Sequence, residues 1–309
     1  MSCKIILLEP VLMEKIWGGT KLEEIYNYPI PSNKTGEAWV ISAHRNGSSI
    51  IKNGKYQGKT LRWLYDNHRY YFGDIQSKEF PLLVKILDAQ SDLSVQVHPN
   101  DDMALKYNDF GKTECWYILD SGSDGEIIYG HNAKSKEEFQ NLIAENKWNQ
   151  LLKTKKIVPG DFIYVPAGKV HAIKANTQIL EIQQSSDVTF RLYDYDRLDD
   201  KGNKRPLHIE ESILATLIPD LEVKNEIVSK QEGLNVYETL IKSKYFTVKR
   251  LIIKEDVELE NPLFLLVSVL NGAGEIYGVG VKKGDNLVIT SELNKFLVSG
   301  DLEIIVIHL

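Results

Sequence analysis

The sequence predicts a mainly β protein built from two barrels of similar design, the first of which carries a helical insertion. Two observations lead to this prediction. Short runs rich in Val, Ile and Tyr alternate with turns, and two parts of the chain repeat one strand–turn–strand pattern. The 309 residues can bury a large core, and 43% hydrophobic with 26% charged residues is typical of a soluble globular protein.

The expected strands run along most of the chain, and three segments have helical spacing instead. Gly, Asn and Asp bound the apolar runs, as is usual at the turns of sheet proteins. The expected strands are residues 37–43, 81–89, 113–120, 125–130, 161–166, 178–184 and 246–253. The expected helices are residues 60–68, 134–152 and 207–218, and Ser135 with Glu138 predicts a capping box for the second. Many strands with few helices favour a β-sandwich or β-barrel over a parallel α/β sheet.

The internal repeat explains the insertion. Gly160–Asp161 and Gly284–Asp285 lie 124 positions apart, whereas Gly122 and Gly272, upstream of them, lie 150 apart. The first copy therefore holds about 26 extra residues, roughly the length of the helical stretch at about 131–156. Two barrels of one design account for both offsets, and chance similarity between strand–turn–strand segments is the alternative.

Charge and composition exclude several classes of protein. The formal net charge of −6, without a basic stripe, argues against nucleic-acid binding. No apolar stretch approaches the ~20 residues that cross a bilayer, and the opening apolar run is too short for a signal peptide. With only two cysteines, a disulfide framework is not expected, and a cytoplasmic location fits.

A short strand carries the first chemical signal. Ser94, Gln96 and His98 alternate with Val95 and Val97, so the pattern has a period of two. In a strand, this period places the three polar side chains on one face and the valines on the other.

The two copies of the repeat differ at positions that can bind metal. His171 in the first copy stands opposite Lys295 in the second, and Glu114 stands opposite Phe264. A histidine that only packs has no reason to disappear together with a glutamate. We therefore group His98, Glu114 and His171 as one metal-binding set, suited to zinc or to Fe, Mn or Co. Taken alone, each histidine would more often be a structural residue than a ligand.

The stretch "GDFIYVPAGKVHAIKAN" resembles the second cupin motif. Gly160, Pro166, Gly168 and His171 match it, and Asn176 comes one residue late. The first cupin motif is altered, with Gln96 where a His is common and a late Glu114. These departures, with "IWGGTKL", "GEAWVIS", "PLLVKILDA", "LSVQVHPND", "KTECWYIL" and "SSDVTFRLYD", resemble the type I phosphomannose isomerases, over residues 16–197.

This resemblance implies an aldose–ketose isomerase that interconverts mannose 6-phosphate and fructose 6-phosphate through a cis-enediol. It implies one zinc ion per chain, held by His98, Glu114 and His171, with Gln96 as a fourth ligand or a group behind the ligands. The expected partner is a small sugar phosphate, and the protein is expected to be a monomer or homodimer. The expected domains are a catalytic cupin-like domain at 1–230 and a metal-free one at 231–309.

The resemblance also implies roles for polar residues around the metal. Glu181 and Arg191 match an acidic and a basic position of the family's active site, and Arg191 would anchor phosphate or steady the enediolate. A surface ion pair with Asp194 or Asp196 is the alternative for Arg191.

Three further polar residues match family positions near the substrate. Lys85 interrupts an apolar strand, where a charge is costly unless it faces a cavity or partner. Lys112 would share a strand face with Glu114 if the strand already begins there. Lys85 and Lys112 match lysines near the phosphate or the reacting carbons, and Lys85, Lys112 or Glu181 could be the proton shuttle. Ser94 matches a position suited to binding phosphate or sugar, or its hydroxyl bonds to backbone.

Two other functions fit a cupin with two histidines and a glutamate. A metal-dependent oxygenase would consume dioxygen with ferrous iron. A sugar-phosphate-binding regulator would keep the fold without the chemistry. The absence of a DNA-binding helix pair or basic tail weakens the second.

Overall fold

The computed structural model describes residues 3–199 and 201–309, and its contacts divide the chain into two compact units. One unit comprises Met1–Val11, Trp39–Leu83 and Lys224–Leu309, and the other comprises Leu12–Ala38 and Val84–Val223. Three strands pass from one unit into the other: β2 (Val11–Gly19), β3 (Thr35–His44) and β6 (Leu82–Ala89).

This division differs from the one expected from the sequence at residue 230. The reason is strand pairing at long range: β1 (Ile5–Glu9) pairs with β21 (Asn286–Ile289) and with β5 (Ile50–Ile51). The N-terminal strand β1 therefore belongs to the sheet of the unit that contains Lys224–Leu309, which we call the C-terminal unit. The functional domains 1–230 and 231–309 stay a prediction.

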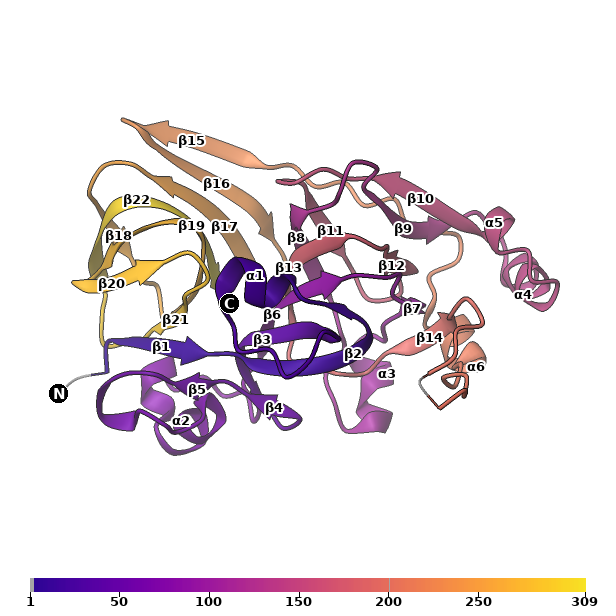
Figure 1. Ribbon diagram of the computed structural model, residues 1–309, viewed down its shortest axis with the longest axis horizontal. Coiled ribbons are helices and arrows are strands. Elements are labelled where there is room, and N and C mark those ends of the chain that lie inside the picture. The colour runs from indigo at the N-terminus through magenta and orange to yellow at the C-terminus, as the bar shows by residue number, and fades with distance from the viewer. Residues whose placement is uncertain (1–2, 200) are drawn as a thin grey trace. The chain divides into compact units, whose positions relative to one another are not determined.

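The unit that contains the predicted site is built on two sheets (Figure 1). One has the strand order β11-β8-β13-β6-β2-β3-β4, of which β4 (Gly47–Ser48) and parts of β3 and β6 belong to the other unit. The other is antiparallel, in the order β10-β9-β12-β7-β14. Their remaining strands are β7 (Val95–Val97), β8 (Glu114–Asp120), β9 (Glu126–His131), β10 (Leu152–Lys156), β11 (Phe162–Val165), β12 (His171–Ile173), β13 (Thr177–Gln184) and β14 (Phe190–Tyr193).

Apolar side chains from both sheets form one core. Trp116, Ile118 and Ile179 from the first sheet pack with Ile127 and Ile173 from the second, and all are buried. The opposite face of the second sheet forms another core with the helices that cover it. Val95 and Val97 lie in this outer core, so the period-two pattern of the sequence correctly predicted which face of β7 is apolar.

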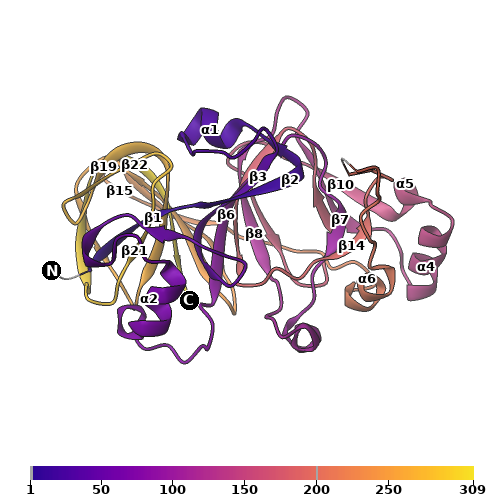
Figure 2. The same ribbon diagram turned by 60° about the horizontal axis from the view of Figure 1, so that its bottom comes forward.

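The predicted helical insertion is only partly helical. It contains α4 (Lys136–Ala144) and α5 (Trp148–Leu151), which pack together (Figure 2), and its last five residues form strand β10. The expected single helix over 134–152 is wrong in its middle, because Asn146 adopts a left-handed conformation that ends the first helix. The capping residue was correct, since the Ser135 hydroxyl accepts a hydrogen bond from the Glu138 amide at 3.1 Å.

The remaining helices are short. The expected helices at 60–68 and 207–218 are confirmed as α2 (Leu61–Asn67) and α6 (Ile209–Ala215). The sequence did not predict α1 (Lys21–Tyr26), α3 (Asp101–Ala104) or the 3₁₀ turns at Gly54–Tyr56, Arg69–Phe72 and Leu105–Tyr107. These segments are too short for a helical period to show.

The other unit is built around a large sheet in the order β15-β16-β17-β22-β19-β21-β1-β5, with β18 paired to β22 and β20 to β19, and it also contains α2. Its other strands are β15 (Val228–Glu232), β16 (Asn235–Lys242), β17 (Thr247–Ile253), β18 (Val257–Glu260), β19 (Leu265–Ile276), β20 (Val279–Lys282) and β22 (Lys295–His308). Its core consists of buried Leu, Ile, Val and Phe side chains.

The turn at the heart of the predicted repeat has the same geometry in both units. Gly160 and Gly284 have φ values of 93° and 88°. The Asp161 carboxylate accepts from the Val158 amide at 2.9 Å, and the Asp285 carboxylate accepts from the Lys282 amide at the same distance. Equal turns at equivalent positions support the repeat over chance similarity.

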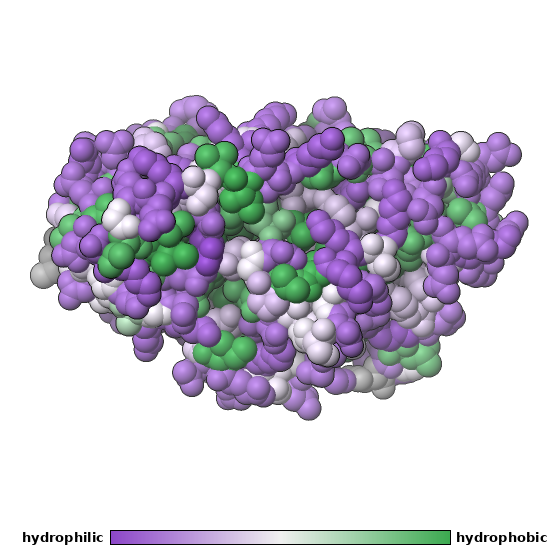
Figure 3. All heavy atoms as spheres, turned by 90° about the horizontal axis from the view of Figure 1, so that it is seen from above, coloured by the Kyte–Doolittle hydropathy of each residue, from purple (hydrophilic) through white to green (hydrophobic). Residues whose placement is uncertain are grey.

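The face of the surface in Figure 3 is mostly hydrophilic, with scattered apolar patches. Isolated apolar side chains are ordinary on protein surfaces. Within residues 3–199 and 201–309, no helix combines the length and the apolar character that a membrane span requires.

Candidate active site

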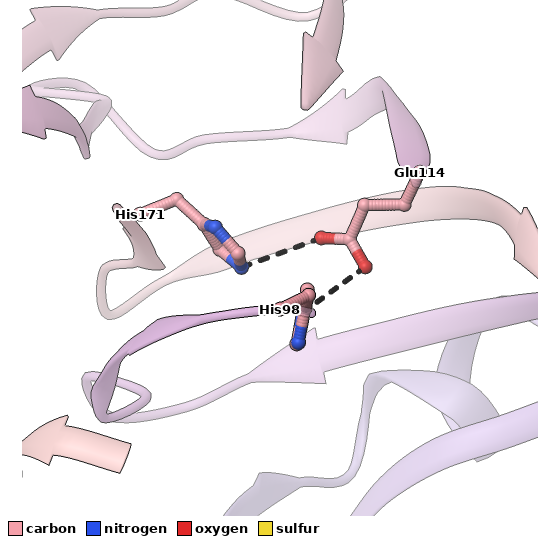
Figure 4. Close-up of side chains that lie close together, drawn as sticks. All are labelled: His98, Glu114 and His171. Atoms are coloured by element: carbon pink, nitrogen blue, oxygen red, sulfur yellow. Dashed lines mark ion pairs between the residues drawn. The ribbon is translucent and has the colours of Figure 1, made fainter. Parts of the chain in front are cut away.

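Three side chains meet between the two sheets: His98 directly follows β7, Glu114 begins β8 and His171 begins β12. Figure 4 shows the Glu114 carboxylate facing both imidazoles, from the start of β8. Its Oε2 lies 3.4 Å from His98 Nε2 and its Oε1 lies 3.5 Å from His171 Nε2. One donor atom from each residue lies within 4.8 Å of the others, and each residue is at most 1% exposed. In the part of the chain that the structure describes, this is the one such cluster that could hold a metal ion.

Backbone carbonyls fix the tautomer of both histidines. His98 Nδ1 lies 3.2 Å from the Val188 carbonyl oxygen, and His171 Nδ1 lies 2.8 Å from that of Lys169. A carbonyl can only accept, so each Nδ1 carries the proton and each Nε2 keeps a lone pair. Both lone pairs face the Glu114 carboxylate. Such a buried set of electron-pair donors fits a divalent cation, which offsets their mutual repulsion.

Burial and nearby charges keep the donors unprotonated. Burial, together with the Lys112 ammonium, lowers the pKa of His98 to about 3, and burial lowers the pKa of His171. Burial alone would raise the pKa of Glu114, but Lys112 and His98 hold it well below its usual range. Neutral imidazoles and an ionised carboxylate are the forms that bind metal.

Gln96 lies on β7 next to this cluster. Its side-chain nitrogen lies 3.3 Å from His171 Nε2. Rotating the amide by half a turn exchanges its nitrogen and oxygen, which would aim an oxygen donor at the same position. The side chain can therefore present either a nitrogen or an oxygen to His171 Nε2.

A cavity of about 250 Å³ adjoins the cluster and is lined mostly by polar residues. Six predicted site residues reach it: Lys85, Ser94, Gln96, Lys112, Glu181 and Arg191. The three clustered donors do not line the cavity themselves, but Gln96 and Lys112 line it and also contact them. A larger cavity, of about 630 Å³, lies between α5 and β9, and none of the predicted site residues lines it. The smaller cavity is the candidate substrate site because the titratable groups converge there.

Two buried ion pairs lie at this cavity. Lys85 Nζ on β6 lies 3.3 Å from Glu181 Oε2 on β13. Burial alone would lower the pKa of Lys85, but Glu181 and neighbouring carboxylates raise it above its usual value. Burial and the charge of Glu114 raise the pKa of Glu181. Lys112 Nζ lies 3.2 Å from Glu114 Oε2 and 3.1 Å from His98 Nε2.

Arg191 on β14 lines the cavity and does not form the surface ion pair considered as its alternative. Asp194 pairs with Arg197 and Arg205, and Asp196 pairs with Lys204. The Arg191 guanidinium donates to the Pro206 carbonyl at 2.7 Å, and its Nε is buried without a hydrogen-bond partner. Burial, with the neighbouring Arg205 charge, lowers its pKa.

Several lining residues were not predicted from the sequence. They are Lys15, Glu37, Asp187, Thr189 and Arg205. Arg205 is the most informative, because its fork holds Asp194 through Nε and Nη2 at 2.8 and 2.6 Å while the side chain borders the cavity. It lies beyond the last resembling phrase, in a stretch without regular spacing, so no sequence signal pointed to it.

Together, two packed sheets, a cluster of metal-ligand type between them and a charged cavity beside it define a metal-binding enzyme of the cupin class. Residues 5–129 match the family "Phosphomannose isomerase type I, catalytic domain", and residues 237–309 match "Mannose-6-phosphate isomerase, cupin domain". The chain belongs to the type I phosphomannose isomerase family, a metal-dependent family of aldose–ketose isomerases.

Relatives match the chain over its whole length. It is 45% identical to mannose-6-phosphate isomerase ManA from Bacillus subtilis, covering 100% of both chains. It is 46% identical to the mannose-6-phosphate isomerase of Streptococcus mutans over 98% of both. The crystal structure of the mannose 6-phosphate isomerase from Bacillus subtilis matches with a TM-score of 0.96, at 42% identity over 99% of this chain and 100% of the other.

These findings confirm the predicted family, the mainly β cupin class and the predicted enzyme class. The closure of each unit into a barrel stays a prediction, as do the individual residue roles.

Proposed function

We propose that this protein interconverts mannose 6-phosphate and fructose 6-phosphate through a cis-enediol. The main support for the proposal is that a cluster of metal-ligand type lies beside a charged cavity. The cluster of His98, Glu114 and His171 adjoins a cavity lined by the Lys85–Glu181 pair and by Arg191. Membership of the family adds the substrate class that such a site would take.

His98, Glu114 and His171 are the proposed ligands of one zinc ion per chain, with Gln96 as a fourth. The bound ion supplies a Lewis acid that stabilises negative charge on the sugar oxygens, worth several kcal/mol. The buried Nδ1–H contacts to backbone carbonyls hold both imidazoles ready for this role.

The phosphate end of the substrate is proposed to bind at Arg191 and Arg205. Both guanidinium groups border the cavity, and each has N–H donors that are not used in hydrogen bonds within the described part of the protein. Their planar forks suit the oxygens of a phosphate. Ser94, buried at the cavity wall, would add a hydroxyl donor.

Glu181 is the proposed proton shuttle between carbons 1 and 2, with Lys85 holding it. The carboxylate lines the cavity, and Lys85 Nζ and Trp116 Nε1 fix its orientation at 3.3 Å each. Lys112, at the boundary between the cavity and the cluster, would donate to the developing enediolate oxygen. A positioned acid or base of this kind contributes about 10² to 10⁴ in rate.

A coupled assay tests the proposal. Purified protein should form fructose 6-phosphate from mannose 6-phosphate, lose this activity with a chelator and regain it when Zn²⁺ is restored. Free mannose should react far more slowly, because it lacks the group that Arg191 and Arg205 bind. Oxygen uptake with ferrous iron in place of isomerisation would contradict the proposal and favour an oxygenase.

The bacterial relatives named as mannose-6-phosphate isomerases and the sugar-phosphate substrate lead us to propose a cytoplasmic location. We also propose that the protein acts as a monomer or homodimer, without nucleic acid or a membrane as partner. Size-exclusion chromatography with light scattering would distinguish the two assembly states.

A further inference from the structure

The turn between β11 and β12 is held on two sides. The Gly168 amide donates to the His98 carbonyl oxygen at 2.9 Å, and the Gly168 carbonyl accepts from the Leu217 amide at 3.0 Å. Gly168 has a φ of +86°, and a Cβ there would lie 2.7 Å from Leu217 Cγ. The turn is thus packed between a proposed metal ligand and the 216–221 segment, which follows α6.

The next residue, Lys169, contacts the other histidine. Its carbonyl oxygen accepts from His171 Nδ1 at 2.8 Å. Its side chain is 3% exposed, and Nζ donates to Asp220 Oδ1 at 2.8 Å and to the Leu221 carbonyl at 2.7 Å. Nζ also lies 4.4 Å from the centre of the Tyr129 ring. Lys169 therefore orients His171 with its main chain and is anchored by its side chain.

Asp220 is the centre of this anchor. Its side chain is 8% exposed and lies between two ammonium groups, Lys169 at 2.8 Å and Lys153 at 3.1 Å. The carboxylate rests on Gly130 of β9, where a Cβ would lie 2.3 Å from Oδ2. Removing one partner of a buried ion pair is costly, so this carboxylate strongly determines where the Lys169 side chain lies.

We propose that Asp220, acting through Lys169, is a positioning residue that keeps His171 Nε2 aimed at the metal and thereby slows metal release. The proposal rests on the ligand set given under the proposed function. Groups behind a ligating histidine fix its ring orientation, and their loss typically lowers metal affinity by about 10- to 100-fold. Asp220 acts one residue further out, so the lower end of this range is expected.

The test measures release of Zn²⁺ from the holoprotein into excess chromogenic chelator. Asp220→Asn and Lys169→Met should each release the ion about 10-fold faster than the parent. With saturating Zn²⁺, kcat should stay within a few-fold, because neither side chain lines the substrate cavity. Glu126→Gln is the matched control: this carboxylate also faces two lysines, Lys174 at 2.8 Å and Lys156 at 3.7 Å, without a contact to Lys169.

A double-mutant cycle separates positioning from general loosening. If Asp220 acts through Lys169, the combined variant should release Zn²⁺ no faster than either single variant. Additive effects, an equal acceleration in Glu126→Gln, or unchanged rates in both single variants would overturn the proposal. If His171→Ala itself retains the ion, the ligand set has failed; if only Asp220→Asn behaves as the parent, this inference alone has failed.

Discussion

The two copies of the repeat share a turn and differ in what lies next to it. In the first copy, Gly160–Asp161 leads into β11, and the next strand, β12, begins at His171. His171 is 1% exposed and faces Glu114. In the second, Lys295 stands at the matched position with 56% of its side chain exposed, 3.6 Å from Glu258 and Glu260. Phe264, matched to Glu114, is buried among apolar rings of its own unit. The same backbone turn is thus followed by a buried polar cluster in the first copy and by a solvent-exposed ion pair in the second.

The difference shows that the site is a property of side chains placed on a common frame. Gly at positive φ and Asp bonded back to the chain are needed by the turn in both units. Histidine and glutamate are needed in one only. We infer a structural role for the C-terminal unit, and the predictions that follow test this comparison.

Removing a proposed ligand should have the largest effect. His98→Ala or His171→Ala should lower kcat/KM by about 10³ or more, because the Lewis acid supplies several kcal/mol. Metal content measured on the purified variants should fall to near zero while circular dichroism stays that of the parent. His308→Ala, in the other unit, is the control. Full metal occupancy in either ligand variant would rule out this set.

Deleting residues 235–309 should abolish the soluble protein. The deletion removes β16 to β22 and leaves Ile5 as the single buried member of the hydrophobic cluster on that unit's large sheet. It also leaves β1 without β21, and an unpaired apolar strand edge promotes aggregation. Fractionation of the expressed fragment measures the outcome. A soluble fragment that retains activity would show that the C-terminal unit has no structural role.

Changing Arg191 to Lys should lower kcat/KM by about 10- to 100-fold, because a hydrogen bond to a charged group contributes about 1.5–3 kcal/mol and an ammonium cannot reproduce the parallel pair of hydrogen bonds that a guanidinium makes to one phosphate. Steady-state kinetics measure this effect. Arg250→Lys, which alters a guanidinium held by Glu238 and Glu303 in the other unit, should behave as the parent. Near-normal kinetics for Arg191→Lys would argue against a role in binding phosphate.

The metal-free protein should lose stability in acid partly through His98. Its pKa is about 3 in the folded protein, against about 6.5 when unfolded, so the unfolded chain takes up the proton first. Its stabilising contribution is complete above pH ~6.5 and decreases as the pH falls towards 3. Chemical unfolding measures the free energy of unfolding at several pH values between 6.5 and 3. As the pH falls, this free energy should decrease less steeply for His98→Gln than for the parent. Parallel curves would contradict the assigned pKa.

The smallest effect is expected at Lys295. Lys295→Ala should leave kcat/KM within a few-fold of the parent, because an exposed ion pair contributes about 0–1 kcal/mol and the residue is not a member of the cluster formed by His98, Glu114 and His171. Kinetics at saturating Zn²⁺ check this. Loss of turnover in this variant would mean that the second copy takes part in the reaction.

The sequence by itself determined the local features of this protein. Strand periodicity identified β6, β7 and β8, and placed Gln96 and His98 on the face opposite Val95 and Val97. The Gly-Asp turns revealed the repeat, and the mismatch between its copies singled out His98, Glu114 and His171. These signals depend on residues close in the chain, where backbone geometry and side-chain alternation leave a readable pattern.

The tertiary structure alone decided what depends on distant pairing. It brought β1 beside β21, it ended α4 at Ala144, ahead of the left-handed Asn146, and it placed Arg205 at the cavity through its contact with Asp194. It also placed Asp220 behind Lys169 and so behind His171. Loops without a repeating pattern carry no periodic signal, and long-range hydrogen bonds and ion pairs form only when the strands that bear them have packed.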